Sequence, residues 1–207
     1  MLPVAGIVLC GGQSKRMGRP KAWLPFAGEI MLPRVVRLLR EAVEPVIVVA
    51  APEQDFPPLP SEVAIVHDEE KGRGPLQGLA AGLEALQGKA AAAYLSSCDV
   101  PFLKPAFVRR LITLLGDHQI CVPKVGEHHH PLAAVYRLEV AAVVNRLLAA
   151  NRMRPFFLFE EVPTRVVTAE ELAEVDPTFE TLRNLNTPED YEAALAEARL
   201  ASTGGAA

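Results

Sequence analysis

The stretch "VAGIVLCGGQSKRMGRPK", residues 4–21, changes from apolar residues to glycine and then to positive charge. Residues 4–10 are almost continuously apolar, which is typical of a strand buried on both faces of a sheet. Gly11 and Gly12 follow at once and allow the backbone to approach a ligand closely. Lys and Arg residues then gather at 15–21. This order predicts an anion-binding loop at the end of the first strand.

Further apolar runs of strand length recur along the chain. They lie at residues 45–51, 63–68, 91–99 and 120–123. Segments with apolar residues three and four positions apart predict amphipathic helices. These segments span residues 31–43, 74–88 and 105–118. Alternating strands and helices predict an α/β fold, a Rossmann-like and mostly parallel sheet with helices on both faces.

Local signals mark several helix ends. Pro75 and Pro105 are expected in the first turns of their helices. Thr187, followed by a proline and two acids, predicts the start of a last helix. Residues 126–167 predict an extra strand, a helix and another strand, whose order in the sheet stays open.

The composition predicts one domain. The chain has 207 residues, half of them hydrophobic, which is enough to bury one sizeable core. We expect this domain to span residues 1–200 and residues 201–207 to form a disordered tail. The formal net charge of -4 argues against a general nucleic-acid binder and against a binder of anionic membranes. An anion site must therefore be local.

Cysteine usage and hydropathy predict the compartment. Cys10, Cys98 and Cys121 are far apart and match neither a disulfide framework nor a zinc site, which favours a reducing cytosol. No apolar stretch approaches the length of a membrane span, and no basic segment precedes a secretory core. We therefore expect a cytoplasmic protein.

The first loop fits neither of the two common phosphate-binding templates. It lacks the Gly-Lys-Ser/Thr of a P-loop and the spaced glycines of a dinucleotide fingerprint. Gly11 and Gly12 can nevertheless offer amides to a phosphate, and Arg16 and Lys21 can neutralise it. The alternative is a Gly-Gly turn followed by a solvated basic face. We favour the phosphate loop because glycines and cations cluster directly after the first strand.

Two aspartates end later strands, at the edge where parallel sheets bind ligands. Asp68 suits a hydrogen bond to a base or sugar, but it equally suits a turn, and both interpretations stay open. Asp99 faces the same edge as the cationic loop, and Mg²⁺ in nucleotide sites prefers one or two carboxylates plus phosphate oxygens. A capping Asp before a proline turn is the alternative. We favour the magnesium ligand because a triphosphate needs charge compensation.

Three further groups of residues carry side chains that could bind a ligand or a metal ion. His128, His129 and His130 are adjacent, so their side chains diverge, and a loop lining a substrate cleft is favoured over a metal site. Cys10 and Cys98 are expected as small buried residues rather than nucleophiles. The residues Asn184 and Asn186 would share one face of an extended segment and either bind substrate or cap the last helix.

Taken together, these motifs resemble those of the molybdenum cofactor guanylyltransferases, members of the nucleotidyltransferase superfamily. The resemblance covers nearly the whole chain. It rests on the ordered set "LCGGQSKRMGRPK", "HDEEKGRGPLQGL", "CDVPFL", "HHHPLAAVYR" and "NLNTPEDY". It implies a nucleotide-diphospho-sugar transferase-like fold and transfer of GMP from Mg²⁺-bound GTP to molybdopterin, with release of pyrophosphate.

The resemblance also implies roles for individual residues. The implied ligand-binding residues are Leu9, Cys10, Gly11, Gly12, Lys21, Asp68, Gly78, Asp99, Asn184 and Asn186. Arg16, Lys21 and Asp99 are implied as catalytic, with Asp99 as the Mg²⁺ ligand. Asn184, Asn186 and an arginine of "NRMR", residues 151–154, would face the pterin. The implied partners are GTP, molybdopterin and molybdoenzyme maturation proteins, and neither nucleic acid nor a membrane.

The chain departs from the family pattern at two points. Relatives often carry an Asn just after the second strand that helps to recognise the nucleotide, whereas this chain has Ala50 and Ala51. Pro20 before Lys21 is also common in the related cytidylyltransferases. The Cys-Gly-Gly of the first loop and the "GPLQGL" segment favour guanine.

Three other functions are alternatives to guanylyl transfer. Two of them are also nucleotidyl transfer reactions: a CTP-dependent molybdenum cofactor cytidylyltransferase and a sugar-phosphate nucleotidyltransferase. The third is a non-catalytic nucleotide-binding or cofactor-binding protein, and the presence of both Lys21 and Asp99 argues against it.

Overall fold

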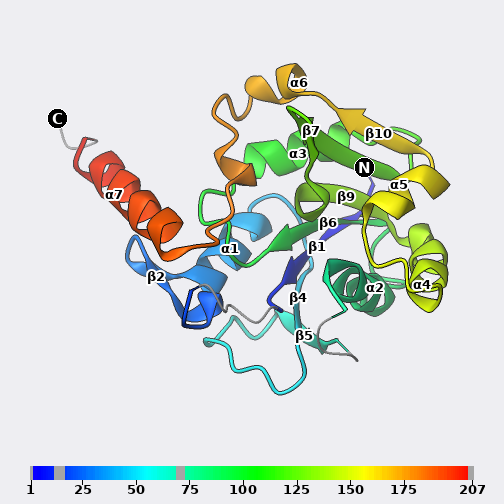
Figure 1. Cartoon of the computed structure of the whole chain (residues 1–207), viewed down its shortest axis with the longest axis horizontal. Coiled ribbons are helices and arrows are strands. Elements are labelled where there is room, and N and C mark those ends of the chain that lie inside the picture. Colours follow the sequence, from blue (N-terminus) through cyan, green and yellow to red (C-terminus); the bar gives the residue numbers. More distant parts are fainter. Residues whose placement is uncertain (1, 12–16, 69–72, 205–207) are drawn as a thin grey trace.

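A computed structural model of the protein describes residues 2–11, 17–68 and 73–204, with only the backbone for 201–204 (Figure 1). Its centre is a sheet in the order β10-β7-β9-β6-β1-β4-β5, with β8 beside β7. These strands are β1 Val4–Leu9, β4 Val46–Ala50, β5 Ala64–His67, β6 Ala92–Ser97, β7 Ile120–Val125, β8 His128–His129, β9 Ala134–Arg137 and β10 Thr164–Val167. A separate hairpin joins β2 Pro25–Phe26 to β3 Glu29–Ile30.

Most pairings in the central sheet are parallel. Strand β1 pairs in parallel with β4 and with β6, β4 with β5, and β7 with β10. Strand β9 lies between β6 and β7 and is antiparallel to both. The prediction of a mostly parallel sheet is confirmed, and all five expected strands are present. The place of β9, which the sequence left open, follows from the short connection after β7, because a short connection favours an antiparallel strand.

Helices cover both faces of the sheet, as expected. They are α1 Met31–Arg40, α2 Pro75–Ala85, α3 Pro105–Leu114, α4 Ala141–Ala149, α5 Phe156–Glu161, α6 Ala169–Ala173 and α7 Pro188–Gly204. Short 3-10 turns are η1 Lys21–Trp23, η2 Pro131–Ala133, η3 Leu138–Val140 and η4 Glu180–Leu182. Pro75 and Pro105 lie in the first turns of α2 and α3, as predicted.

The pleat of β1 divides the core into two layers. Val4 and Val8 belong to the apolar cluster that includes residues of α1 and α3, whereas Ile7 and Leu9 belong to the cluster that includes residues of α2 and α4. Figure 1 shows α2 and α4 side by side on their face of the sheet. Burial of both faces explains why the strand sequence is almost continuously apolar.

Strand β5 differs from the expectation of burial on both faces. It is an edge strand whose described pairing is with β4 alone, and Ile65 is 38% exposed. An apolar run of strand length does not by itself distinguish an edge position from a central one.

The C-terminal helix packs away from the sheet. Tyr191 and Ala194 of α7 join a third apolar cluster with Leu24 and Phe26 from the β2–β3 region. Thr187 Oγ1 accepts the Asp190 N–H at 3.2 Å, which confirms the predicted cap. The helix continues past residue 200, where we expected the domain to end, and residues 205–207 lie outside the described part.

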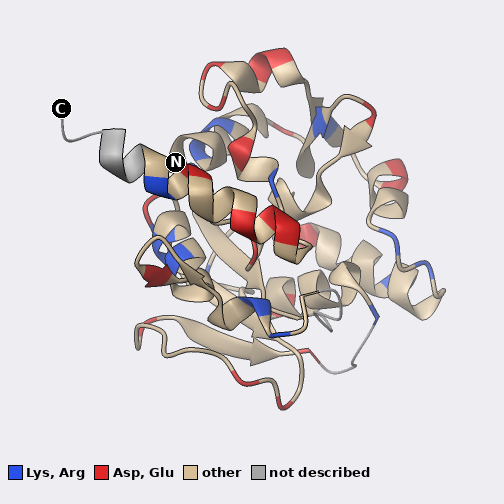
Figure 2. Ribbon diagram, turned by 60° about the vertical axis from the view of Figure 1, so that its left-hand side comes forward, with Lys and Arg blue, Asp and Glu red and all other residues tan. Residues whose placement is uncertain are grey.

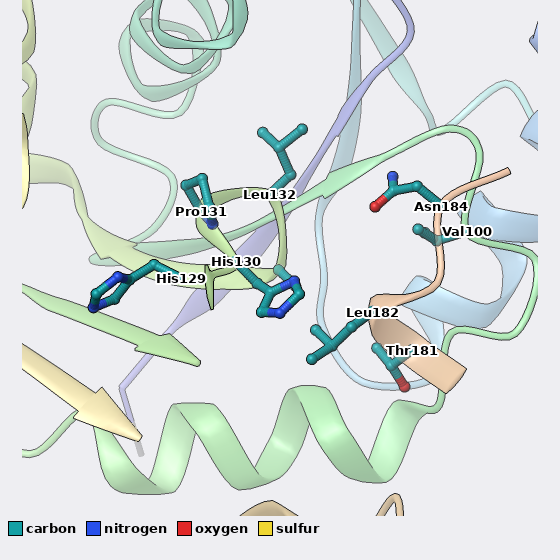
Figure 3. A pocket seen from close by; sticks show the side chains of 9 residues that line it. Val100, His129, His130, Pro131, Leu132, Thr181, Leu182 and Asn184 are labelled. Atoms are coloured by element: carbon teal, nitrogen blue, oxygen red, sulfur yellow. The ribbon is translucent and has the colours of Figure 1, made fainter. Parts of the chain in front are cut away.

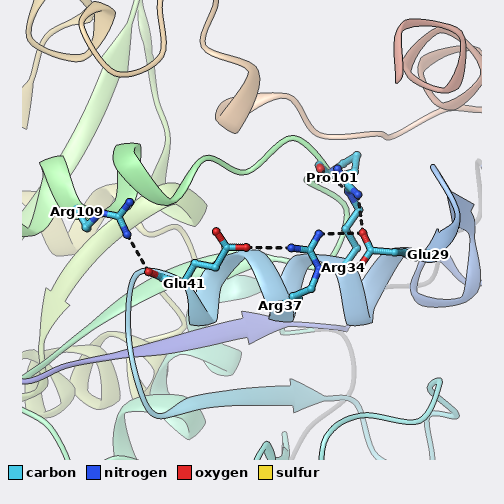
Figure 4. Close-up of polar contacts among 6 residues, drawn as sticks. All are labelled: Glu29, Arg34, Arg37, Glu41, Pro101 and Arg109. Atoms are coloured by element: carbon cyan, nitrogen blue, oxygen red, sulfur yellow. Dashed lines mark hydrogen bonds and ion pairs between the residues drawn. The ribbon is translucent and has the colours of Figure 1, made fainter. Parts of the chain in front are cut away.

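Ion pairs on α1 connect the hairpin to the turn after β6 (Figure 4). Arg34 NH1 pairs with Glu29 Oε2 at 2.6 Å, and Arg34 Nε donates to the Pro101 carbonyl at 2.9 Å. Arg37 also pairs with Glu29, at 2.8 Å. Arg34 therefore links Glu29 of the hairpin to Pro101, two residues after Asp99.

Charge is spread over the molecule. In the view of Figure 2, short acidic and basic segments are scattered among uncharged ones. Among the helices that the structure describes, none is long and apolar enough to cross a bilayer.

Candidate active site

A cleft of about 1760 Å³ opens at the carboxyl ends of β1, β4, β5 and β6. The segment from Gly18 to Trp23 and the residues Asn184 and Asn186 complete its walls. Sites for one small ligand measure about 300–1,000 Å³, so this cleft exceeds the size of a single-ligand pocket. Parallel strands bring their carboxyl ends to one edge, which is why residues from distant parts of the sequence meet here.

An ion pair stands in this cleft. Lys21 Nζ lies 2.6 Å from Asp99 Oδ2, and the two side chains are 17% and 10% exposed. Lys21 opens the turn η1, and Asp99 lies just past the end of β6, after Cys98. The structure thus brings together the two residues that the sequence proposed for phosphate and metal. Partial burial strengthens such a pair because water screens it less.

Two neutral side chains hold the second oxygen of Asp99. Ser97 Oγ donates to Asp99 Oδ1 at 2.6 Å, and Asn184 Nδ2 donates to the same oxygen at 2.8 Å. Asn184 Nδ2 also contacts Ser97 Oγ at 2.9 Å. Ser97 was not predicted, although the period of two in a strand places it on the same face as Asp99.

Asn186 completes the network from the side of the lysine. Its Oδ1 accepts a hydrogen bond from Lys21 Nζ at 2.9 Å. Between the two asparagines, the Leu185 N–H donates to the Asp99 carbonyl at 3.0 Å. Both amides therefore face the Lys21–Asp99 pair, as their spacing suggested.

A buried carboxylate fixes the segment that leads to these asparagines. Asp176 is 0% exposed and accepts hydrogen bonds from Lys104 Nζ at 2.8 Å and from the Thr181 N–H at 2.9 Å. Burial alone would raise the pKa of Asp176, but the bonds from Lys104 and Thr181 outweigh it and lower that pKa. The ionised Asp176 therefore ties η4 to the start of α3.

Gln54 joins the end of β1 to the turn after β4. Its Nε2 donates to the Cys10 carbonyl, and its Oε1 accepts the Ala51 N–H at 3.2 Å. This amide lines the cleft beside Ala50 and Ala51. Sequence reasoning missed Gln54, because a glutamine in a loop carries no local signal of such a contact.

Cys10 and Cys98 face each other at the base of the cleft. Both are buried, as predicted, and the Cys98 N–H donates to the Leu9 carbonyl at 3.0 Å. A hydrogen bond to Cys10, together with burial, raises the pKa of Cys98. Cys98 is therefore a protonated thiol at neutral pH.

The remaining predicted residues are distributed as follows. Leu9, Gly11, Asp68 and Gly78 line the cleft. A Cβ at Gly78 would lie 2.9 Å from a terminal carbon of Leu9, so this glycine lets α2 approach β1 closely. Gly12 and Arg16 lie outside the described residues.

The "NRMR" arginines lie elsewhere in the described structure. Arg152 pairs with Glu161 at 2.8 Å and stacks on Phe157. Neither Arg152 nor Arg154 is among the described residues that line the cleft.

A smaller pocket of about 210 Å³ adjoins the cleft and shares Leu132 and Asn184 with it. Figure 3 shows His129 and His130 on one side of this pocket and Thr181, Leu182 and Asn184 on the other. Burial first, and then the two neighbouring histidines, lower the pKa of His130, so its ring is neutral at pH 7. The histidine segment thus lines a cavity, although His128 itself is exposed.

The donor set of the cleft fits one kind of metal ion. Among the described residues, no group of three or more His, Cys, Asp or Glu side chains gathers to enclose a cation. Asp99 presents a carboxylate oxygen 2.6 Å from Lys21 Nζ. Mg²⁺ commonly binds through one or two carboxylates, with water and substrate phosphates as its other ligands. The residues present therefore fit a cation that shares its ligands with a nucleotide.

Comparison with known proteins agrees with this geometry. Residues 6–164 match the family model described as a MobA-like NTP transferase domain. A protein of Mycobacterium avium named "Probable molybdenum cofactor guanylyltransferase" is 34% identical over 96% of this chain and 98% of its own length.

Solved structures share the fold. Molybdopterin-guanine dinucleotide biosynthesis protein A from Archaeoglobus fulgidus superposes with a TM-score of 0.78 at 21% identity, covering 94% of this chain and 98% of its own. A Mycobacterium tuberculosis protein in complex with manganese superposes with a TM-score of 0.66 at 18% identity, covering 94% and 98%. The family model and the curated relative together show that this chain belongs to the MobA-like NTP transferases and is a nucleotidyltransferase.

Proposed function

We propose that the protein transfers GMP from Mg²⁺-bound GTP to molybdopterin, giving the guanine dinucleotide form of the molybdenum cofactor and pyrophosphate. The observation that carries the proposal is the Lys21–Asp99 pair, with 2.6 Å between Nζ and Oδ2, at the carboxyl edge of the sheet. A cation-binding carboxylate beside a lysine suits a triphosphate. The names of the curated relatives support guanine and molybdopterin as the two substrates.

The chain's own residues supply positioning and charge. Lys21 and Arg16 would hold the triphosphate, and the backbone of residues 9–12 would cradle it. Asp99 would hold a Mg²⁺ ion, which would offset the negative charge on the phosphates, and the manganese in the M. tuberculosis structure supports a divalent cation here. The acceptor phosphate is itself the nucleophile. Transfer therefore depends on alignment and charge neutralisation and needs no protein nucleophile.

The two substrates would lie on either side of Asp99. The nucleotide base would lie toward β4 and β5, where Asp68 and Gln54 line the cleft. The pterin would lie toward Asn184 and Asn186, where the smaller pocket continues the cleft. Because Ala50 and Ala51 carry no polar side chains, base selection would rest on Asp68, Gln54 and neighbouring backbone groups.

Nucleotide selectivity tests the proposal. The protein is incubated with Mg²⁺, molybdopterin and each of the four nucleoside triphosphates, and dinucleotide and pyrophosphate are measured. We expect product from GTP. Product from CTP alone would establish the cytidylyltransferase. Transfer to a sugar phosphate but not to molybdopterin would establish the sugar-nucleotide enzyme. Nucleotide binding without any transfer would favour a non-catalytic carrier.

Three further proposals accompany this function. We propose a single nucleotidyltransferase domain over residues 1–200. We also propose a cytoplasmic location and contact with molybdoenzyme maturation proteins.

A further inference from the structure

Both oxygens of Asp99 already have partners within the protein. Oδ1 accepts two hydrogen bonds, from Ser97 and from Asn184, at 2.6 and 2.8 Å. Oδ2 accepts from Lys21 Nζ at 2.6 Å. A carboxylate oxygen has two lone pairs, so Oδ2 is the one that can still take a cation.

A cation bound to Asp99 Oδ2 would lie beside the Lys21 ammonium, which donates to the same oxygen. Mg²⁺ lies about 2.0–2.1 Å from its oxygen ligands. An ammonium group on the same oxygen would then stand close to a doubly charged ion, and the cleft screens this repulsion less than bulk water does. Lys21 and a metal ion therefore compete for Asp99.

A triphosphate removes this competition. Lys21 Nζ also donates to Asn186 Oδ1 at 2.9 Å, and Asn186 is exposed, so the ammonium stands at the open side of the cleft. A phosphate group there offers the ammonium a charged partner, and it brings the metal its further oxygen ligands at the same time.

We propose that Lys21 holds the metal-binding oxygen of Asp99 until a triphosphate draws the ammonium away, so that the cation enters together with the nucleotide rather than before it. This inference rests on the proposed function, because it takes a nucleoside triphosphate as the ligand. Ser97 and Asn184 have a positioning role in it, since they keep Oδ1 occupied and leave Oδ2 as the exchange point.

Binding of Mn²⁺ without nucleotide tests whether Lys21 competes with a metal ion for Asp99. The free ion is measured by electron paramagnetic resonance in the full chain without nucleotide. Lys21→Met removes the competing charge, so we expect it to bind Mn²⁺ at least about tenfold more tightly than the unmodified protein. Lys89→Met is the matched control, because Lys89 Nζ donates to the Ala85 carbonyl and its loss frees no carboxylate. Equal affinity in the Lys21→Met and Lys89→Met variants would overturn the proposal.

Binding of GTP in the presence of EDTA tests whether Asp99 competes with a triphosphate for Lys21. Asp99→Asn releases Lys21, so we expect this variant to bind metal-free GTP more tightly than the unmodified protein. Asp55→Asn removes a negative charge from an exposed position in the same cleft and should have a smaller effect. An Asp99→Asn variant that gains no more than Asp55→Asn would contradict the exchange. This experiment also decides the question if Lys21→Met fails to fold.

These measurements are independent of the transfer reaction. Neither uses an acceptor, and Mn²⁺ binding uses no nucleotide. Failure of the exchange would leave guanylyl transfer standing, whereas absence of transfer would leave the Mn²⁺ result unchanged.

Discussion

At the scale of single residues, the site is organised around Asp99. Its carboxylate joins Lys21 from the first loop to Asn184 from the segment before the last helix. The contact from Ser97 was not foreseen, yet it comes from the same strand end. One carboxylate thus links three parts of the chain that are far apart in sequence.

Asp99→Ala tests this central role. We expect transfer to fall by at least about a thousandfold, because charge stabilisation at the phosphates is lost. The free energy of unfolding should change by less than about 2 kcal/mol, because water in the open cleft can solvate the groups left behind. Turnover is measured with Mg²⁺ and GTP, and stability by urea unfolding. Unmodified turnover in this variant would remove Asp99 from the metal role.

Ser97→Ala tests the positioning of the carboxylate. Asn184 still donates to Oδ1, so we expect a partial loss of kcat, about 10-fold to 100-fold, as for other residues that orient a metal ligand. Ser96→Ala is the matched control, since Ser96 is also buried and its hydroxyl donates to the Ser97 carbonyl rather than to Asp99. The steady-state rates of the two variants are compared at saturating GTP. Equal losses in both would point to packing rather than to orientation of Asp99.

At the scale of elements, the segment between α6 and α7 delivers the two asparagines. Asp176 anchors it through Lys104 and the backbone of Thr181. From the other side, Arg34 on α1 bonds Pro101 in the turn after Asp99. These bonds bring a late segment of the chain to the end of β6.

Asp176→Asn tests the anchor. Asp176 is buried, but Lys104 is 33% exposed and also pairs with Glu180 at 2.8 Å. We therefore expect loss of the carboxylate charge to lower the free energy of unfolding at pH 7 by about 2 kcal/mol. The folded pKa of Asp176 lies below its ordinary value of 3.8, so its contribution is full above pH 3.8. This contribution to stability is lost as the pH falls through the pKa that Asp176 has in the folded protein.

The stability difference between the unmodified protein and this variant should therefore shrink in acid. Urea unfolding at pH 7 and at pH 3 measures it. Asp117→Asn removes the same charge from an exposed turn and should have little effect at either pH. A difference that stays constant from pH 7 to pH 3 would show that Asp176 acts through packing alone.

At the scale of the whole molecule, ligand binding should stabilise the fold by mass action. GTP with Mg²⁺ at about a hundred times its dissociation constant adds about 2.7 kcal/mol. For a chain of 207 residues this corresponds to a rise in Tm of about 5–10 °C. CTP at the same concentration should give a smaller rise. Differential scanning fluorimetry measures both, and a larger shift with CTP would reverse the assignment of the base.

Much of the architecture could be predicted because its causes are local. The apolar runs at β1, β4 and β6 are strands, and the periodic segments at α1, α2 and α3 are helices. Burial of both strand faces and of one helix face imposes these patterns directly on the sequence. The position of a strand within the sheet has less effect on its sequence pattern. The exposure of the edge strand β5 and the place of β9 were therefore not predicted.

Part of the candidate site could also be predicted from the sequence, and part of it could not. Glycines, a lysine and an aspartate at strand ends are visible in the sequence because parallel strands send their carboxyl ends to one edge. The sequence by itself thus determined the α/β class, the family resemblance and the choice of Lys21 and Asp99. Only the tertiary structure decided that Asp99 is bonded on both oxygens, that Gln54 ties β4 to β1, and that Asp176 anchors the asparagine segment. The contacts of Asp99 with Lys21 and Asn184, of Gln54 with Cys10 and of Asp176 with Lys104 join residues far apart along the chain. Their distances depend on how the whole chain packs.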